Sequence, residues 1–145
     1  MTGPGALERL RRALRDVLVL EIRRPEARAL TLLAVEEVAA NIVEHGYGGE
    51  PNRPISVTVT IEPGGVFTII LRDRAPLKDV TSLPSGDLKE LARTSATRGR
   101  GLAMIDLLAR SVTHRKRRGG GNELELVFDA EDLVRRVEAS LKDAA

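Results

Sequence analysis

Two short segments of alternating apolar and polar residues, joined by a turn signal, set the centre of the expected fold. Ile55–Ile61 alternates strictly along its length, and parts of Val66–Leu71 do the same. Pro63-Gly64-Gly65 lies between them. A period of two is typical of a β-strand, and a glycine-containing connection of this length is typical of a hairpin. The sequence therefore predicts a β-hairpin over residues 55–71.

Helical periodicity and a second strand pair surround this hairpin. Apolar residues at helical spacing predict helices at 6 to about 20, 25 to about 45, 101 to about 109 and 130 to about 142. A second pair of strands is expected at 111–117 and 123–128, around a glycine-rich turn. This order predicts an α+β fold, a two-layer α/β sandwich with helices on one face of a mixed, mainly antiparallel sheet. A length of 145 residues fits one domain over 1–145.

Composition excludes several kinds of site. The chain has no Cys, which rules out disulfides, thiolate zinc sites and a cysteine nucleophile. Aromatic residues make up 2% of the chain, so a core of Leu, Val, Ile and Ala is expected and a base-stacking nucleic-acid surface is not. No apolar run is long enough to span a membrane and no signal-peptide core is visible, so a cytoplasmic protein without a membrane partner is expected.

Charge does not point to nucleic acid either. The net charge of +2 comes from 23 basic and 21 acidic residues, which is close to balance. One basic cluster, His114–Arg118, stands out, and a solvated strand end is the preferred interpretation of it. No direct contact with nucleic acid is therefore predicted.

A helical stripe of three polar residues is the first candidate site. Glu37, Asn41 and His45 are spaced by four residues, so they line one face of the second predicted helix. A solvated polar face is one interpretation. The other is functional: Asn41 supplies an oxygen to Mg²⁺, and Glu37 takes a proton from an attacking hydroxyl.

The end of the first hairpin is the second candidate. Asp73 follows the second strand directly, and the small residue Ala75 comes two positions later. A carboxylate there can accept a hydrogen bond from an exocyclic amine, and a small neighbour lets a flat ring approach the backbone. The alternative is an ordinary Asp turn.

A glycine pair is the third candidate. Arg98-Gly99-Arg100-Gly101-Leu102 opens the third predicted helix after a polar stretch, residues 74–98, that is long enough to be a functional lid. Backbone N–H groups and the dipole at a helix start favour a phosphate, and the two arginines add positive charge. The alternative is that the two glycines only end a loop, since the pattern is neither a Walker loop nor a Rossmann fingerprint.

Together, the order and spacing of these three signals resemble the Bergerat fold of the histidine-kinase-like (GHKL) ATPases. The segment 34–47 is similar to the bacterial anti-sigma factor serine/threonine kinases, and segments 100–108 and 120–124 agree with them. The resemblance extends from about residue 6 to residue 128. It implies a kinase that binds ATP and Mg²⁺, phosphorylates a Ser or Thr of a STAS-type anti-sigma factor antagonist and sequesters a sigma factor; it also allows a homodimer.

Residue roles follow from the resemblance. It implies that Glu37 is the general base, that Asn41 ligates Mg²⁺ and that Asp73 accepts the adenine amine. It further implies that the remaining candidates line the nucleotide site, namely His45, Ala75, Arg98, Gly99, Arg100, Gly101 and Leu102. Arg11 matches an arginine with which the family contacts its partners.

Departures from the family pattern support one alternative function. Ala75 stands where the family usually has Gly, and Asn122 or Glu123 stands where many relatives have a late Thr. Residues 1–5 cannot supply the strand that precedes the first helix in the family. The alternative is a catalytically degenerate GHKL-fold binding module, which regulates a partner without phosphoryl transfer. The catalytic half of a histidine kinase is disfavoured, because no helix pair with a phospho-accepting His precedes the domain.

Overall fold

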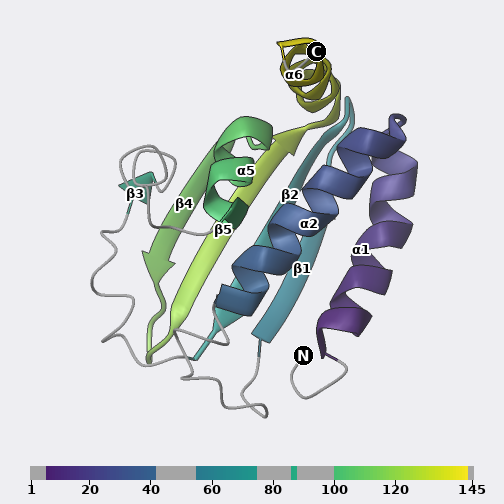
Figure 1. The fold of residues 1–145 in the computed structure, drawn as a ribbon. Helices are drawn as coiled ribbons and strands as arrows, with labels where there is room; N and C mark the ends of the chain where they lie inside the picture. The colour runs from purple at the N-terminus through teal and green to yellow at the C-terminus, as the bar shows by residue number, and fades with distance from the viewer. Residues whose placement is uncertain (1–5, 42–54, 75–85, 88–99, 144–145) are drawn as a thin grey trace.

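A computed structural model describes residues 6–41, 55–74, 86–87 and 100–143 (Figure 1). The elements are α1 (Ala6–Glu21), α2 (Pro25–Asn41), β1 (Ile55–Ile61), β2 (Val66–Asp73), β3 (Gly86–Asp87), α5 (Arg100–Leu108), β4 (Ser111–Lys116), β5 (Asn122–Asp129) and α6 (Ala130–Asp143). The predicted hairpin, second strand pair and helices are confirmed. The part of the second helix predicted beyond Asn41 lies outside the described residues.

The two predicted strand pairs join into one sheet through their second strands. The strand order is β1-β2-β5-β4-β3, and all four pairings between described strands are antiparallel. The pairing of β2 with β5 runs from Val66 opposite Asp129 to Asp73 opposite Asn122. The end of β2 therefore lies against the start of β5.

Helices cover one face of this sheet, which confirms the α+β architecture. In Figure 1, α2 and α5 lie over the sheet, α1 lies beside α2 near the β1 edge, and α6 lies across the end where β5 finishes. The side chains of β2 alternate between the two faces of the sheet. Phe67, Ile69 and Leu71 are buried under the helices, whereas the side chains between them are half-buried on the uncovered face. None of the helices among the described residues is both long and apolar enough to cross a membrane.

The core contains an aromatic pair that the composition did not predict. Phe67 and Phe128 lie opposite each other in register, and their rings stack with centroids 5.1 Å apart and an interplanar angle of 17°. Both side chains are completely buried. The expectation of a purely aliphatic core was wrong at this point, because strand register brings both phenylalanines of the chain to one place.

The central helix α2 is apolar on most of its sides. Its buried residues are Ala27, Thr31, Ala34, Val35, Val38 and Ala39. The one polar member, Thr31, donates its hydroxyl to the carbonyl of Ala27 at 2.8 Å, so it is satisfied within the helix. Because α2 is buried on several sides, packing holds its C-terminal half, with Glu36 and Glu37, in place.

One strand interrupts the segment expected to form a lid. Gly86 and Asp87 form β3 and pair with His114 and Thr113 of β4. Two residues are too few for any periodic signal, so the sequence could not predict this element. The remainder of the segment 75–98 lies outside the described residues.

Candidate functional site

Several chain ends meet at one end of the two layers. In Figure 1 the C-terminal end of α2, the N-terminal end of α5, the end of β2 and the start of β5 all lie at the end opposite α6. Near the other end of α2, Arg24, which directly precedes the helix, bonds through its Nη1 to Glu138 Oε1 of α6 at 2.7 Å. The first two candidate sites of the sequence, on α2 and at the end of β2, therefore belong to the same end of the fold.

Asp73 is the best-defined member of the site. Its side chain faces the helices, and the residue is 3% exposed. Asn122, directly opposite on β5, donates its amide Nδ2 to Asp73 Oδ1 at 2.9 Å. Burying a carboxylate is costly unless it is hydrogen-bonded, and this bond supplies part of that compensation. The result is a fixed, buried acceptor at a strand end, as the first-hairpin candidate requires.

His114 extends this arrangement to a third strand. It is 3% exposed, and its Nε2 lies 3.0 Å from Asn122 Oδ1. A carboxylate can only accept, so the Asn122 NH₂ faces Asp73 and the Asn122 oxygen faces His114. The imidazole must then carry a hydrogen on Nε2, an assignment that follows from the network. We call these three residues the Asp73–Asn122–His114 chain.

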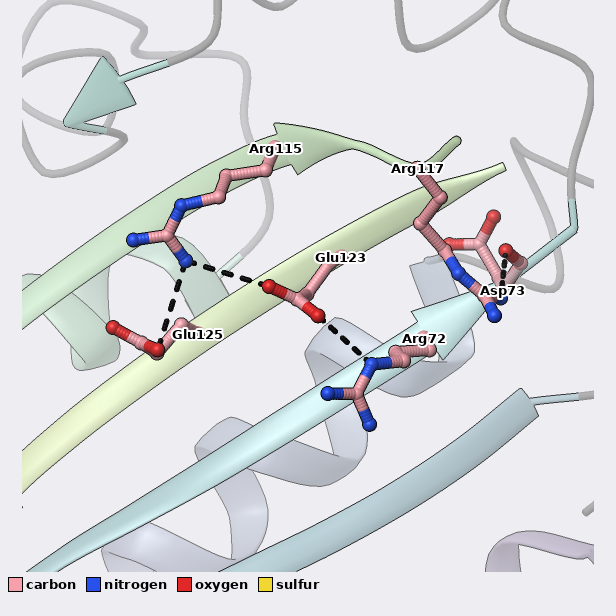
Figure 2. A network of polar contacts seen from close by, with 6 residues as sticks. All are labelled: Arg72, Asp73, Arg115, Arg117, Glu123 and Glu125. Carbon is pink, nitrogen blue, oxygen red and sulfur yellow. Dashed lines mark hydrogen bonds and ion pairs between the residues drawn. The ribbon is translucent and has the colours of Figure 1, made fainter. Parts of the chain in front are cut away.

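The turn between β4 and β5 holds the end of β2 in place. Arg117 Nη1 donates to the backbone carbonyl of Asp73 at 2.9 Å (Figure 2), and Arg74 Nη1 reaches the carbonyl of Gly120 at 3.4 Å. Gly121 has a φ of +97°, and a Cβ there would lie 2.1 Å from the Asp73 carbonyl oxygen. Only a glycine allows the two strands to approach this closely.

The basic cluster His114–Arg118 does not behave as one solvated strand end. That interpretation was wrong for His114, which is buried, and for Arg117, which bonds to β2. Alternate residues of β4 point to opposite faces, so Arg115 lies on the uncovered face of the sheet. There it pairs with Glu123 at 3.4 Å and Glu125 at 3.6 Å (Figure 2).

The two adjacent acids of α2 have different surroundings. Glu36 forms a two-pronged ion pair with Arg11 of α1, through Arg11 Nε to Oε1 and Arg11 Nη2 to Oε2 at 3.3 Å. The hydrogen bond and the charge of Glu36 raise the pKa of Arg11 above its ordinary value. Glu37 is half-buried and makes no hydrogen bond or ion pair with any other described side chain. Glu37 is therefore the carboxylate of this turn that is not committed to holding α1.

The remaining predicted residues are placed in part. Asn41 is the last residue of α2, and Arg100, Gly101 and Leu102 form the first turn of α5, so the glycine motif does open a helix. The side chains of these four residues lie outside the described part of the structure, as do four further candidates entirely: His45, Ala75, Arg98 and Gly99.

Two residues of this site were missed by the sequence. Asn122 was noted as part of segment 120–124, which resembles the family, and as a departure from the family's late Thr, and His114 only as part of a basic cluster. The usable signal was the alternation over Ser111–Lys116, which places His114 on the same face as Val112. The strand order was also needed, because it brings the second strand pair beside the first, with β5 next to β2.

The chemistry of these residues fits a purine nucleotide carrying a divalent cation. A buried acceptor at a strand end suits an exocyclic amine, and the start of α5 suits a phosphate. No group of three or more His, Asp or Glu side chains within the described residues comes together as a metal site. A nucleotide-bound Mg²⁺ takes several of its ligands from phosphates and water, so one amide oxygen such as that of Asn41 suffices from the protein.

Known proteins show the same fold. The family model described as the histidine kinase-like ATPase domain matches residues 2–128. A chain from the crystal structure of the SiaB-SiaC complex of Pseudomonas aeruginosa is 16% identical, with a TM-score of 0.64 over 88% of this chain and 87% of that one. The histidine kinase domain of a blue-light activated histidine kinase from Erythrobacter litoralis EL346 is 13% identical, with a TM-score of 0.56 over 91% of this chain and 63% of that one. No match was found among curated proteins.

Proposed function

The chain belongs to the histidine kinase-like ATPase domain family, and from that premise we propose that it is an anti-sigma factor kinase. In this proposal it binds ATP with Mg²⁺ and transfers the terminal phosphate to a Ser or Thr of a STAS-type anti-sigma factor antagonist. It also sequesters a sigma factor.

The observation that carries the proposal is the buried carboxylate of Asp73. It is held by Asn122 at 2.9 Å, at the same end of the layers as the C-terminal turn of α2 and the start of α5. The base of ATP would bind at Asp73, which accepts the adenine amine. Its phosphates would extend toward the first turn of α5, where Arg100 and Gly101 begin the helix.

The α2 turn supplies the chemical groups. Asn41 would provide an oxygen to the Mg²⁺ that accompanies the phosphates, and Glu37 lies one helical turn before it on the same face. Glu37 would accept the proton of the attacking hydroxyl. Catalysis of phosphoryl transfer otherwise consists of positioning and charge stabilisation, so a small number of such groups is enough.

Partner binding is supported by one of the structural neighbours. A chain of the same fold was solved in the SiaB-SiaC complex, as an assembly of two different proteins. The resemblance of segment 34–47 to anti-sigma factor kinases supports a partner of the antagonist type and a sigma factor.

The test is phosphate transfer by variants of the two adjacent glutamates. Glu37→Gln should lower the rate of transfer from ATP to a STAS-type antagonist of the same organism by about 10²–10⁴-fold, because an amide cannot accept the hydroxyl proton. ATP affinity, measured on the same preparation by calorimetry, should change little. Glu36→Gln is the matched control, because Glu36 is committed to Arg11. It should keep the parent rate within a few-fold.

Each result has a definite meaning. Equal transfer by Glu37→Gln and the parent would exclude Glu37 as the base. A parent that binds ATP with Mg²⁺ but transfers no phosphate would favour the degenerate binding module.

A further inference from the structure

The Asp73–Asn122–His114 chain continues deeper into the fold than a nucleotide contact at Asp73 requires. A single donor from Asn122 already satisfies Asp73 Oδ1. The other end of the Asn122 amide, its Oδ1, lies 3.0 Å from Nε2 of the buried His114 imidazole. The Nδ1 atom of that imidazole is buried and has no hydrogen-bond partner in the described part of the protein.

This unpaired nitrogen argues against a purely structural role. Burying a polar atom without a partner lowers the stability of a fold, so an apolar side chain of similar size would serve the core better at this position. Val112, on the same strand and the same face, shows that the surroundings accept an apolar residue. The imidazole is accounted for by what its other nitrogen does, which is to donate to Asn122.

We propose that Asn122 and His114 are positioning residues, which hold the carboxylate of Asp73 as an acceptor oriented to select a purine with an exocyclic amine over one with an exocyclic oxygen. This inference rests on the proposed function, in that Asp73 is taken to contact the base. His114 itself contacts no ligand in the proposal. It acts through Asn122.

The direction of each hydrogen bond determines how the Asp73–Asn122–His114 chain orients the carboxylate. The Nε2–H of His114 occupies the Asn122 oxygen, so the Asn122 NH₂ is directed to Asp73 Oδ1 and the carboxylate plane is fixed. Without the His114 Nε2–H, the Asn122 amide is held only by its bond to Asp73. The Asp73 carboxylate can then adopt more orientations, and binding a base must restrict it to one. The penalty falls on ligands that donate to the carboxylate. A base that presents an oxygen there is repelled in either case.

The experiment uses the full chain with Mg²⁺ and compares ADP with inosine diphosphate, which has an oxygen in place of the amine. His114→Leu should weaken ADP binding by about 5–10-fold, the effect of one lost hydrogen bond, and leave inosine diphosphate within twofold. His114→Gln offers a side-chain amide donor and should restore most of the preference for ADP. Val112→Ala is the matched control: it should lower the melting temperature without changing the ADP/inosine diphosphate affinity ratio.

A second measurement needs neither variant nor ligand. Heteronuclear NMR of the imidazole nitrogens in the parent should show His114 protonated on Nε2 and bare on Nδ1. A proton on Nδ1 alone would overturn the direction of the chain and with it the proposal. This readout stands even if His114→Leu does not fold.

The remaining outcomes separate this proposal from the proposed function. If the parent prefers ADP and His114→Leu keeps the same affinity ratio, the positioning role is wrong and the proposed function stands. The positioning role is also wrong if Val112→Ala lowers the ratio as much as His114→Leu does. If the parent binds neither nucleotide, the proposed function fails and the positioning role fails with it.

Discussion

Asp73 offers the most direct test at the scale of a single residue. In Asp73→Asn the new amide oxygen can still accept from Asn122, which turns the new NH₂ toward the base. That group repels an exocyclic amine, so ATP affinity should fall by about 5–150-fold, or ~1–3 kcal/mol. The affinity for inosine triphosphate should rise relative to the parent, because its exocyclic oxygen now meets a donor. Calorimetry with both nucleotides measures the change.

A matched control separates the local effect from the change in net charge. Asp16→Asn removes the same charge from an exposed position on α1 and should leave both affinities unchanged. Unaltered ATP binding by Asp73→Asn would show that Asp73 does not contact the base.

The sequence could single out residues whose position follows from local pattern, while their roles stay predictions. Asp73 was identified because it follows a strand directly, and the structure places it as a buried acceptor. Asn122 and His114 could not be found in that way, because their roles depend on which strands are neighbours. Arg11 was matched to a partner-contacting arginine, which stays a prediction; in the structure its guanidinium pairs with Glu36 of α2.

At the scale of elements, the approach of β5 to β2 depends on one glycine. In Gly121→Ala the new Cβ would lie 2.1 Å from the Asp73 carbonyl oxygen and 2.9 Å from the Arg74 Cα, so the strands must separate. The left-handed backbone should cost roughly 1–3 kcal/mol of folding free energy, and the backbone overlap about 1–3 kcal/mol more. ATP affinity should fall as well, because Asp73 moves away from Asn122. Denaturant unfolding and calorimetry give the two quantities.

Gly120, next to Gly121, provides a control that separates the effect of the close contact from the effect of the left-handed backbone conformation. Gly120 has a φ of +105°, but a Cβ there would meet nothing within 4 Å. Gly120→Ala should therefore show only the conformational cost and keep ATP affinity. If the two variants unfold at the same denaturant concentration, the close approach at Gly121 does not stabilise the site.

The elements themselves were predictable where periodicity extends over enough residues. The hairpin of β1 and β2 and the amphipathic helices α1 and α6 were expected close to their observed bounds. The two-residue strand β3 has no periodic pattern. The pairing of β2 with β5 joins residues that are 49 (Asp73 and Asn122) to 63 (Val66 and Asp129) positions apart in the chain, too far for a local pattern to predict.

For the molecule as a whole, a ligand that binds only the native state raises the free energy of unfolding, so its binding can be followed through the melting temperature. A ligand at about 100 times its Kd adds ~2.7 kcal/mol to the free energy of unfolding if the unfolded chain does not bind it. For a domain of this size that corresponds to a rise in melting temperature of roughly 5–11 °C. ATP with Mg²⁺ should therefore stabilise the parent, and ATP with a chelator should do so less.

The difference between those two melting temperatures should depend on Asn41. Asn41 is the last residue of α2, the helix packed between α1 and α5. A cation bound by its side-chain oxygen would therefore be attached to the middle helix of the layer. Asn41→Ala should melt close to the parent without ligand, since it ends a helix, and should keep the rise produced by ATP with the chelator. The extra rise from Mg²⁺ should disappear. Glu36→Gln, on the same helix, should retain the extra rise from Mg²⁺, so it controls for a general change in α2. If the parent melts at one temperature with ATP whether or not Mg²⁺ is present, Asn41 has no cation to hold, and the nucleotide is bound through its base and phosphates alone.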